Sequence, residues 1–332
     1  MSKRNHLDTK VILHRRGQFR NVIGILSLVL ALSSARGVEL GWDSGNSVHE
    51  SAKSACPHFF VQGSEPRILN PKLALNIRQL CFSSFAVGYS PVSRTPLWSA
   101  EHLTRESLAR AKGLKRVNAF HEESRLPISE RSFLSDYAKS GFDRGHMSPS
   151  ADQPSEQAQQ DSFSLANMVP QNPNNNRHLW EGIESATRTR VKSAGDLYVI
   201  TGPLFIGSSV DQLHGRVMVP THLFKIIYDP AQGAASAYLV LNKDTEEYSV
   251  ISLEELSKIA GIDFLPMLNS NVQRVKIELP TPTPHHQRSD SNFDVQKDGR
   301  NRNSYEAQPQ AQSGAEFRQV EHLLKEIARH LN

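Results

Sequence analysis

The residues best suited to chemistry lie within residues 142–190, a stretch that begins FDRGHMSPSADQ and ends SLANMVPQNPNNNRHLWEGIESATRTR. His146 is a candidate general base, because an imidazole with a pKa near 6.5 is largely neutral at pH 7 and can accept a proton. Such a base contributes about 10²–10⁴ in rate. Gly145 would allow a tight backbone turn between His146 and the preceding Asp143 and Arg144. Any one of the 14 histidines is more often a surface or hydrogen-bonded residue than a catalytic one, so the residues around His146 must support a catalytic role.

The asparagine-rich run NPNNN at residues 172–176 predicts the start of a helix and offers a metal ligand. Proline suits the first helical turn and asparagine is a good cap, so a helix is expected from here to about Lys192. An asparagine oxygen is a hard, neutral ligand for Mg²⁺, an ion that keeps several waters and needs few protein ligands. Asn175 and Asn176 are both candidates for this ligand. For the whole run, a simple cap or turn is the alternative.

Trp180 and Glu184 follow Asn176 at four-residue intervals, which predicts that all three share one helical face. Glu184 would lie about 12 Å from Asn176 along the helix axis, because each residue rises by about 1.5 Å. We therefore expect Glu184 to hold a water of the ion's hydration shell rather than the ion itself.

A basic cluster surrounds this face and consists of Arg144, Arg177, Arg188, Arg190 and Lys192. Clustered arginines suit phosphate recognition, and Arg188 can reach the same site as Glu184 or simply pair with it. For Arg190 and Lys192, an ion-paired helix surface explains the charge equally well. The stretch from Arg105 to Arg116 could extend a phosphate-binding groove, although a surface helix is the simpler interpretation. A base, a hard metal ligand and phosphate binders are together what phosphodiester hydrolysis requires.

Several β-strands are legible beyond this region. They are the segments 197–201, 222–228, 236–241 and 248–251. The first two precede Gly202-Pro203 and Asp229-Pro230, which typically end strands. Strands joined by short turns predict an antiparallel sheet.

A helix is expected after the last of these strands. Ser252 and Glu255 form a capping box at its start, and Gly261 would end it with a left-handed cap. Because helices and strands do not alternate regularly along the chain, the predicted fold class is α+β.

The composition divides the chain into a leader at 1–35, a folded domain at 56–279 and a tail. The tail begins with a proline-rich, polar linker at 280–314, which lacks the apolar residues needed to offset ordering entropy. It ends with a helix at 315–332, whose apolar residues recur at helical spacing. This stripe consists of Phe317, Val320, Leu324, Ile327 and Leu331.

Residues 1–35 have the organisation of a signal peptide, with a basic start, an apolar run from Val22 to Leu32 and small residues up to Ala35. The apolar run is short for a bilayer span, so an uncleaved membrane anchor is the weaker alternative. A mitochondrial presequence is weaker still, because the run is continuous rather than amphipathic. The predicted localisation is periplasmic or secreted.

Loss of the leader would remove the net positive charge of the chain. The whole chain is formally +4, and the leader holds six of the 38 lysines and arginines but one of the 34 acidic residues. The remainder therefore has 32 basic and 33 acidic residues. Any site for a polyanion must be a local basic patch.

The chain has two cysteines, Cys56 and Cys81, and both follow the predicted cleavage point. In an oxidising compartment they could pair, and closing a loop of this length typically stabilises a protein by about 3 kcal/mol. The alternative is two buried free thiols. Two cysteines are too few for a zinc site without additional histidines.

The motif DRGH at Asp143–His146 resembles the signature of the DNA/RNA non-specific endonucleases, the ββα-metal nucleases. NMVPQ at 167–171, the positions Asn176, Trp180 and Glu184, and TGP at 201–203 keep the order and spacing of that family. The segment PLWSAEHLT at 96–104 is similar to the family's strand before the catalytic region. The resemblance spans about residues 75–265.

This resemblance implies the fold and the activity together. The fold would have a β-hairpin that leads to the base, a helix that crosses it with the metal ligand, and a central antiparallel sheet flanked by helices. The activity would be sequence-independent hydrolysis of DNA and RNA that depends on Mg²⁺, with Mn²⁺ as a substitute. A homodimer and a protein inhibitor are both compatible with the sequence. The alternatives are a nucleic-acid-binding module without catalysis and a phosphodiesterase restricted to RNA.

The resemblance also assigns roles to individual residues. It makes His146 the general base and favours Asn176 over Asn175 as the Mg²⁺ ligand. The other implied catalytic residues are Arg144, Asn167, Glu184 and Arg188, with Asn167 and Glu184 as active-site supports and Arg188 at the phosphate. A further arginine is expected upstream of DRGH near the phosphate, and Arg94 and Arg105 both fit this position.

Overall fold

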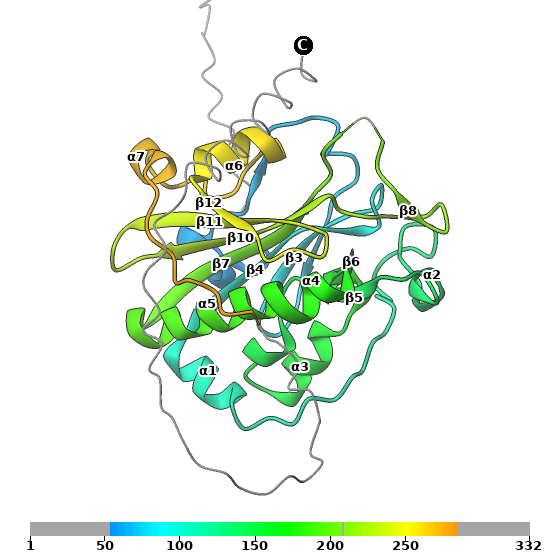
Figure 1. Ribbon diagram of the computed structural model, residues 1–332, viewed down its shortest axis with the longest axis horizontal. Coiled ribbons are helices and arrows are strands. Elements are labelled where there is room, and N and C mark those ends of the chain that lie inside the picture. Colours follow the sequence, from blue (N-terminus) through cyan, green and yellow to red (C-terminus); the bar gives the residue numbers. More distant parts are fainter. Residues whose placement is uncertain (1–53, 208, 285–332) are drawn as a thin grey trace, which may run out of the picture. The chain divides into compact units, whose positions relative to one another are not determined.

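An antiparallel sheet of seven strands forms the centre of the computed structural model, which describes residues 54–207 and 209–284 (Figure 1). In spatial order the strands are β12 (Tyr248–Ile251), β11 (Ala234–Leu241), β10 (His222–Asp229), β7 (Asp196–Leu204), β4 (Thr95–Thr104), β3 (Ala86–Ser90) and β2 (Arg78–Cys81). Every neighbouring pair is antiparallel. The predicted α+β class, the central antiparallel sheet and the predicted strands are confirmed.

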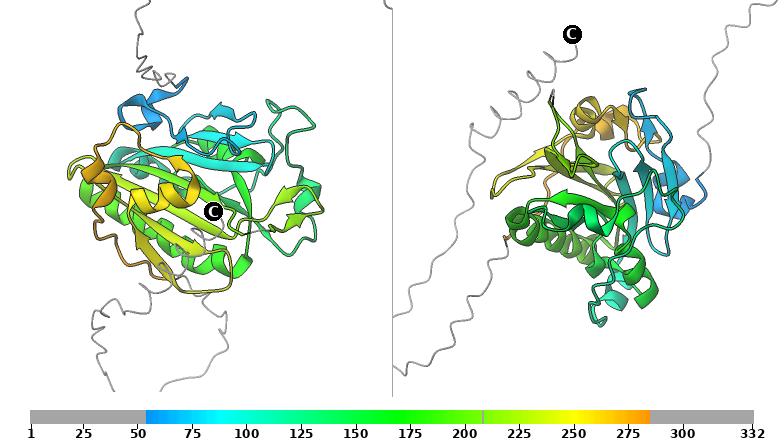
Figure 2. Two further views of the ribbon diagram at one scale, coloured as in Figure 1. Left: turned by 90° about the horizontal axis from the view of Figure 1, so that it is seen from above. Right: turned by 90° about the vertical axis from the view of Figure 1, so that its right-hand side faces the viewer.

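Helices cover both faces of this sheet (Figure 2). One face carries α5 (Glu181–Ala194) and α1 (Arg105–Ala111), and the other carries α6 (Leu253–Ala260) and α7 (Ser270–Arg274). The central strands are therefore apolar on both sides. In β10, Leu223 and Ile227 pack in the core beneath α5, whereas Phe224 and Ile226 pack in the core that includes α6.

The smaller elements lie around this framework. They are β1 (Arg67–Ile68) paired with β13 (Ile262–Asp263), β8 (Gln212–Leu213) paired with β9 (Val217–Met218), α2 (Leu134–Tyr137), α3 (Glu156–Ser162), and the short turns η1 (Pro57–Phe59), η2 (Val61–Gly63), η3 (Ser150–Asp152) and η4 (Leu165–Asn167). The expected start and end of α6 are confirmed: Ser252 and Glu255 form the capping box, and Gly261 ends the helix at a φ of 66°.

Gly202-Pro203 does not end a strand as predicted, because β7 continues through Leu204. A Cβ atom at Gly202 would lie 2.4 Å from the carbonyl oxygen of Leu97 and 2.6 Å from the ring of Phe224. The glycine therefore serves close packing within the sheet rather than strand termination.

The element that carries the chemistry is a β-ribbon followed by a helix. Strands β5 (Asp143–His146) and β6 (Met168–Gln171) pair antiparallel, as the family resemblance implies for the strands that lead to His146. The chain then enters α4 (Pro173–Asn175), one π-helical turn η5 (Asn176–Trp180) and α5. Asn172 caps the start of α4 by accepting hydrogen bonds from the backbone of residues 174 and 175.

A disulfide joins Cys56 to Cys81, so the predicted pairing is confirmed. It fixes the segment before β1 to the end of the edge strand β2. Phe59 and Phe60 of this segment are buried in the core that includes α6. The bridge thus closes one side of that core.

The leader at 1–35 and the helix predicted for 315–332 lie outside the described residues. Of the predicted linker, residues 280–284 are described, and they pack against α5 and β11. Pro282 is buried, and the hydroxyl of Tyr238 donates a hydrogen bond to the carbonyl of Pro280. Within 54–207 and 209–284, none of the helices combines the length and apolar character needed to cross a bilayer.

Candidate active site

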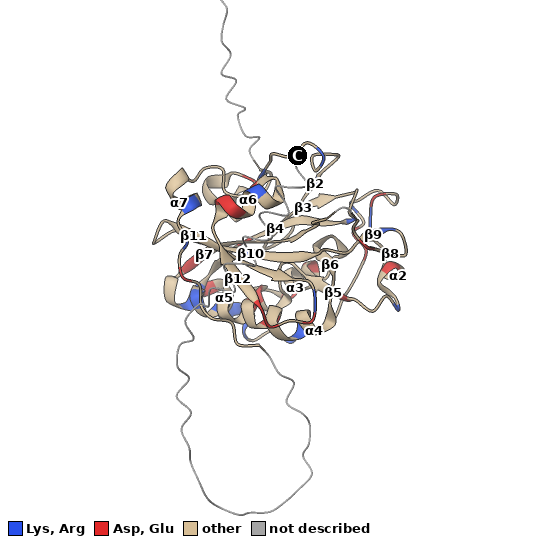
Figure 3. Cartoon of the chain, turned by 45° about the horizontal axis from the view of Figure 1, so that its top comes forward, with Lys and Arg blue, Asp and Glu red and all other residues tan. Residues whose placement is uncertain are grey.

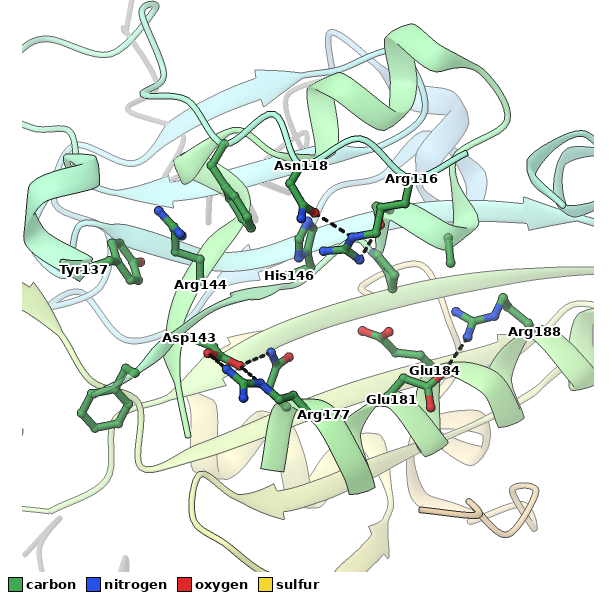
Figure 4. A pocket seen from close by; sticks show the side chains of 16 residues that line it. Arg116, Asn118, Tyr137, Asp143, Arg144, His146, Arg177, Glu181, Glu184 and Arg188 are labelled. Atoms are coloured by element: carbon green, nitrogen blue, oxygen red, sulfur yellow. Dashed lines mark hydrogen bonds and ion pairs between the residues drawn. The ribbon is translucent and has the colours of Figure 1, made fainter. Parts of the chain in front are cut away.

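A cavity of about 630 Å³ lies between the β5–β6 ribbon, the segment before it and the start of the long helix (Figure 4). His146, Arg144, Arg116 and Asn118 form one side, and Arg177, Glu181, Glu184 and Arg188 extend from the helix on the other side. Figure 3 shows charges of both signs along α5. The ribbon and the helix therefore bring a histidine, carboxylates and several arginines to one hollow.

His146 is the last residue of β5, and its ring is held in an aromatic frame. The ring lies edge-on to Phe163, with centroids 4.9 Å apart, and 5.7 Å from the ring of Phe120. Burial, together with the nearby Arg116 cation, lowers the pKa of His146 to about 3. The imidazole is therefore neutral at physiological pH. Its Nε2 atom is buried and has no hydrogen-bond partner among the described residues.

Asn176 lines the cavity, and its amide is oriented by a charged neighbour. The Nδ2 atom donates to the carboxylate of Asp143 over 2.9 Å, and Asp143 is itself held by Arg177 at 2.7 Å. Because Nδ2 is engaged, Oδ1 is the end of the amide that remains for a cation. Asn175 lies outside the cavity and is fully buried. Its amide accepts a hydrogen bond from Gln171 and donates one to the carbonyl of Leu241.

The helix does not present Asn176, Trp180 and Glu184 on one face as predicted. Residues 176–180 form a π-helical turn, in which i and i+5 rather than i and i+4 are stacked. Trp180 is consequently turned into the core beneath α5, where it is 1% exposed. Glu181 lines the cavity together with Asn176 and Glu184. A regular helical spacing of four residues does not indicate Glu181, so this residue was missed.

Glu184 is a half-buried carboxylate that lines the cavity. Burial raises its pKa to about 7, against the lowering effect of Lys225 and Arg188. Lys225 reaches this region from β10, and its Nζ donates to Thr201 over 2.7 Å beneath the helix. The carboxyl of Glu184 therefore changes its charge near neutral pH rather than in acid.

Three of the predicted basic residues, Arg144, Arg177 and Arg188, line the cavity. The guanidinium of Arg144 lies 4.3 Å from the ring centre of Phe120. Arg188 contacts the buried Asp152 at 3.0 Å and Glu181 at 3.6 Å. These guanidinium groups line the same cavity as His146 and Asn176, so an anion there would meet positive charge.

The comparison with known proteins agrees with this geometry. Residues 64–271, more than half of the chain, match the family described as DNA/RNA non-specific endonucleases. The chain belongs to this family. It is therefore an endonuclease, an enzyme that hydrolyses phosphodiester bonds in nucleic acids.

Individual members of the DNA/RNA non-specific endonuclease family show how far the similarity extends. Nuclease C1 of Cunninghamella echinulata var. echinulata is 36% identical over 207 residues, which cover 56% of this chain and 82% of that protein. Mitochondrial endonuclease G of Bos taurus is 32% identical over 213 residues, covering 58% and 71%. A chain in the crystal structure of the EndoG/EndoGI complex superposes with a TM-score of 0.55 at 26% identity, covering 58% of this chain and 88% of that chain.

The arginine expected upstream of DRGH in this endonuclease is neither Arg94 nor Arg105. Arg94 donates to the carbonyls of Arg216 and Ser129, and Arg105 donates to that of Lys192, all away from the cavity. Arg116 lines the cavity instead. Arg116 is the last residue of the basic stretch 105–116, and no pattern in that stretch distinguished it from the residues of a surface helix. That helix ends at Ala111.

Arg116 is fixed at the wall of the cavity by polar contacts. Its Nε donates to Asn118 and its Nη1 to Ser150, each over 2.9 Å. Its guanidinium also lies 5.2 Å from the ring centre of Phe163. Since Phe163 packs against His146 as well, Arg116 and the histidine are held beside each other.

Three other predicted residues of the endonuclease lie outside the cavity. Arg190 pairs with Asp229 at 2.8 Å, and Lys192 is exposed, so the ion-paired helix surface is the correct alternative for this end of α5. Asn167 is fully buried and holds the backbone just after His146: its side chain bonds to both the N–H and the carbonyl of Ser148. Asn167 therefore supports the strand that carries the base, without facing the cavity.

Gly145 does not form the tight turn that was predicted, because it lies within strand β5. A Cβ atom there would lie 2.0 Å from the side-chain oxygen of Gln171. Glycine is required so that Gln171 can pack against the ribbon and hold Asn175. The motif thus depends on close packing rather than on backbone freedom.

Proposed function

We propose that this endonuclease cleaves DNA and RNA without regard to sequence, with His146 as the general base and a divalent cation, Mg²⁺, held by Asn176. The observation that supports this most directly is the cavity itself, which His146 and Asn176 line together with four arginines, residues 116, 144, 177 and 188. A phosphate placed between the two residues would contact the base on one side and the cation on the other.

The imidazole of His146 is suited to accept a proton because burial keeps it neutral. Its lowered pKa would make it a weak base if nothing else entered the cavity. A bound phosphodiester offsets the charge of Arg116, which is one cause of the low pKa. Substrate binding therefore raises the basicity of the ring at the moment when a proton must be taken from water.

The residues of the cavity fit a hard divalent cation. The amide of Asn176 is anchored through Nδ2 to Asp143, so its oxygen is presented as a ligand of fixed orientation. When bound, Mg²⁺ would supply charge stabilisation for the transferring phosphate and the leaving 3′ oxygen. Mn²⁺ is the expected substitute, because the ligands are oxygen atoms.

The arginines and Glu184 complete this proposal. Arg188 and Arg116 approach from opposite sides and would orient the phosphate oxygens. Arg144 would contact the same phosphate or its neighbour from the β5 strand. The Glu184 carboxylate adds a hydrogen-bond acceptor on the helix side, and Asn167 holds the strand of the base in place.

The test is cleavage of plasmid DNA, single-stranded DNA and RNA by the purified chain across a series of divalent ions. Mg²⁺-dependent cleavage of all three is expected, and His146→Ala should lose about 10²–10⁴ in rate while unfolding like the wild type. Wild-type rates in His146→Ala would refute the assignment of the base. Cleavage of RNA alone would establish the restricted phosphodiesterase, and binding without cleavage at any ion would establish a binding module.

We further propose that the leader at 1–35 directs export to the periplasm or beyond the cell, and that 315–332 forms a separate helix after the linker. The disulfide between Cys56 and Cys81 supports an oxidising compartment. Several related nucleases are mitochondrial, so import into mitochondria is the alternative localisation. N-terminal sequencing of the mature protein and its location after fractionation would decide.

A protein inhibitor is a reasonable partner, since the related EndoG has one in the EndoG/EndoGI complex. A homodimer is also proposed from the family resemblance. Sedimentation of the purified chain would test the dimer directly.

A further inference from the structure

The short turn η3, which follows the strand of the proposed base, contacts two arginines of the cavity. Ser150 and Asp152 are its first and last residues, and both are buried. The Nη1 atom of Arg116 donates to the hydroxyl of Ser150 over 2.9 Å, and that of Arg188 donates to the carboxylate of Asp152 over 3.0 Å. Arg116 and Arg188 lie on opposite sides of the cavity (Figure 4). One turn therefore holds an arginine on each side.

The turn η3 is anchored to the central sheet by buried hydrogen bonds. The side-chain amide of Gln153 donates to Glu101 of β4 over 3.2 Å and to the carbonyl of Pro149 over 2.9 Å. The hydroxyl groups of Ser148 and of Ser99, also in β4, are hydrogen-bonded over 2.9 Å. A buried network in which polar groups satisfy one another makes a segment rigid. Both ends of the turn are thus fixed against β4.

Helix α5 carries a second aspartate–arginine pair, and it offers a comparison for the first. Arg190 and Asp229 lie 2.8 Å apart, against 3.0 Å for Arg188 and Asp152, and each aspartate side chain is 2% exposed. Arg188 lines the cavity, whereas Arg190 does not. Breaking either pair leaves an arginine without its buried partner, so the cost in stability should be similar. An effect on cleavage is expected from the cavity pair alone.

An arginine that stabilises a transition state must be held in position before the substrate arrives. Its side chain is long and has many rotamers, so a guanidinium without a partner is free to move. A displacement of about 1 Å at a catalytic group can cost about 10²-fold in rate. Because a guanidinium has five N–H donors, one bond to Asp152 leaves others of Arg188 for a phosphate.

We propose that Asp152 and Ser150 are positioning residues, which hold Arg188 and Arg116 at a fixed spacing so that both contact the scissile phosphate. This inference rests on the proposed function, because that function assigns the phosphate to these two arginines. A single short segment, residues 146–152, then carries the base and orients the arginines on both sides. The buried hydrogen bonds of Gln153 and Ser148 keep this segment in register with β4.

The first test compares Asp152→Asn with Asp229→Asn in the full chain, in steady-state cleavage of duplex DNA at saturating Mg²⁺. Asp152→Asn should lower kcat by about 10-fold or more without raising KM, because Arg188 still binds the phosphate but is no longer held in place. Asp229→Asn should keep the kcat of the wild type, although it also loses a buried ion pair. Rates are measured well below the Tm of each variant, so that unfolding does not contribute. A wild-type kcat in Asp152→Asn, or an equal loss in Asp229→Asn, would overturn the inference.

Double-mutant cycles show through which arginine each positioning residue acts. In single-turnover assays, Asp152→Asn should lower the rate no further in Arg188→Ala, but by its full factor in Arg116→Ala. Ser150→Ala should show the reverse pattern, with a smaller factor because Arg116 keeps its bond to Asn118. Equal factors in both arginine backgrounds would refute the proposal.

The Ser150→Ala cycle decides the matter if Asp152→Asn does not fold, since it removes only a hydroxyl. The positioning role and the proposed function fail in different ways. A wild-type chain that cleaves no nucleic acid with any divalent ion would contradict the proposed function itself. An active wild type whose Ser150→Ala and Asp152→Asn variants keep full kcat would contradict the positioning role alone.

Discussion

Replacing Glu184 with glutamine should make the folded protein more stable at alkaline pH while it impairs cleavage. Burial raises the pKa of this carboxyl from 4.5 to about 7. Between these two values the unfolded chain has released the proton and the folded chain still holds it. The free energy of unfolding therefore falls as the pH rises through this window. Above pH 7 the full cost of the buried charge is present.

The size of the effect follows from the same pKa values. A pKa difference of one corresponds to about 1.36 kcal/mol, so raising the pKa from 4.5 to about 7 costs about 3 kcal/mol above pH 7. Glutamine has nearly the same shape and carries no charge at any pH. Glu184→Gln should therefore be more stable than the wild type by about 3 kcal/mol at pH 8, and the difference should vanish near pH 4.5.

Thermal unfolding with EDTA present is the suitable assay, because a bound cation would stabilise the wild-type carboxylate. Wild type, Glu184→Gln and the exposed control Glu156→Gln are compared at pH 5 and pH 8. For a domain of this size, about 3 kcal/mol corresponds to roughly 6–12 °C in Tm. The reasoning would be refuted if Glu184→Gln gained no stability at pH 8, or if it gained as much at pH 5.

Other predictions address the pH profile, the arginine, the buried amide and the disulfide. The kcat/KM of the wild type should rise with pH through about 7 as Glu184 ionises, and this limb should be absent from a pH series on Glu184→Gln. Arg116→Ala should lower kcat/KM by about 10²–10³-fold through loss of a donor to the developing charge, with Lys as a partial rescue in steady-state assays. Asn167→Ala should cost about 2–5 kcal/mol in urea unfolding, because it leaves the buried N–H and carbonyl of Ser148 unpaired; a smaller loss than in an exposed asparagine variant would contradict this. Reduction of the bond between Cys56 and Cys81 should lower stability by about 3 kcal/mol, and an unchanged unfolding midpoint in dithiothreitol would argue against that bridge.

Local residue patterns placed most of the framework correctly, because each pattern lies within one short segment. Strand β12 and the capping box of Ser252 depend on residues that are neighbours in the chain, and both are found where they were expected. The DRGH motif and the helix after Asn172 likewise follow one another closely in sequence. The geometry of short segments is determined by their own side chains, so it can be predicted without the rest of the fold.

The errors concern residues whose role depends on distant packing. Gly145 and Gly202 are glycines because Gln171 and the neighbouring strands approach them closely, so the turn predicted at Gly145 and the strand end predicted at Gly202 were wrong. Arg116 enters the cavity through contacts with Ser150 and the ring of Phe163. Such contacts join segments that are far apart in the chain, and a pattern within one segment does not record them.

The sequence by itself determined the family, the order of the strands along the chain, and the candidates for the base and the metal ligand. Tertiary structure alone decided that Trp180 faces the core and Glu181 the cavity, because one π-helical turn shifts the helix register by a residue. It also decided that the pKa of His146 falls and that of Glu184 rises, since both shifts arise mainly from burial. Burial depends on how the ribbon, the helix and the sheet pack together, and that packing is not a property of any single segment.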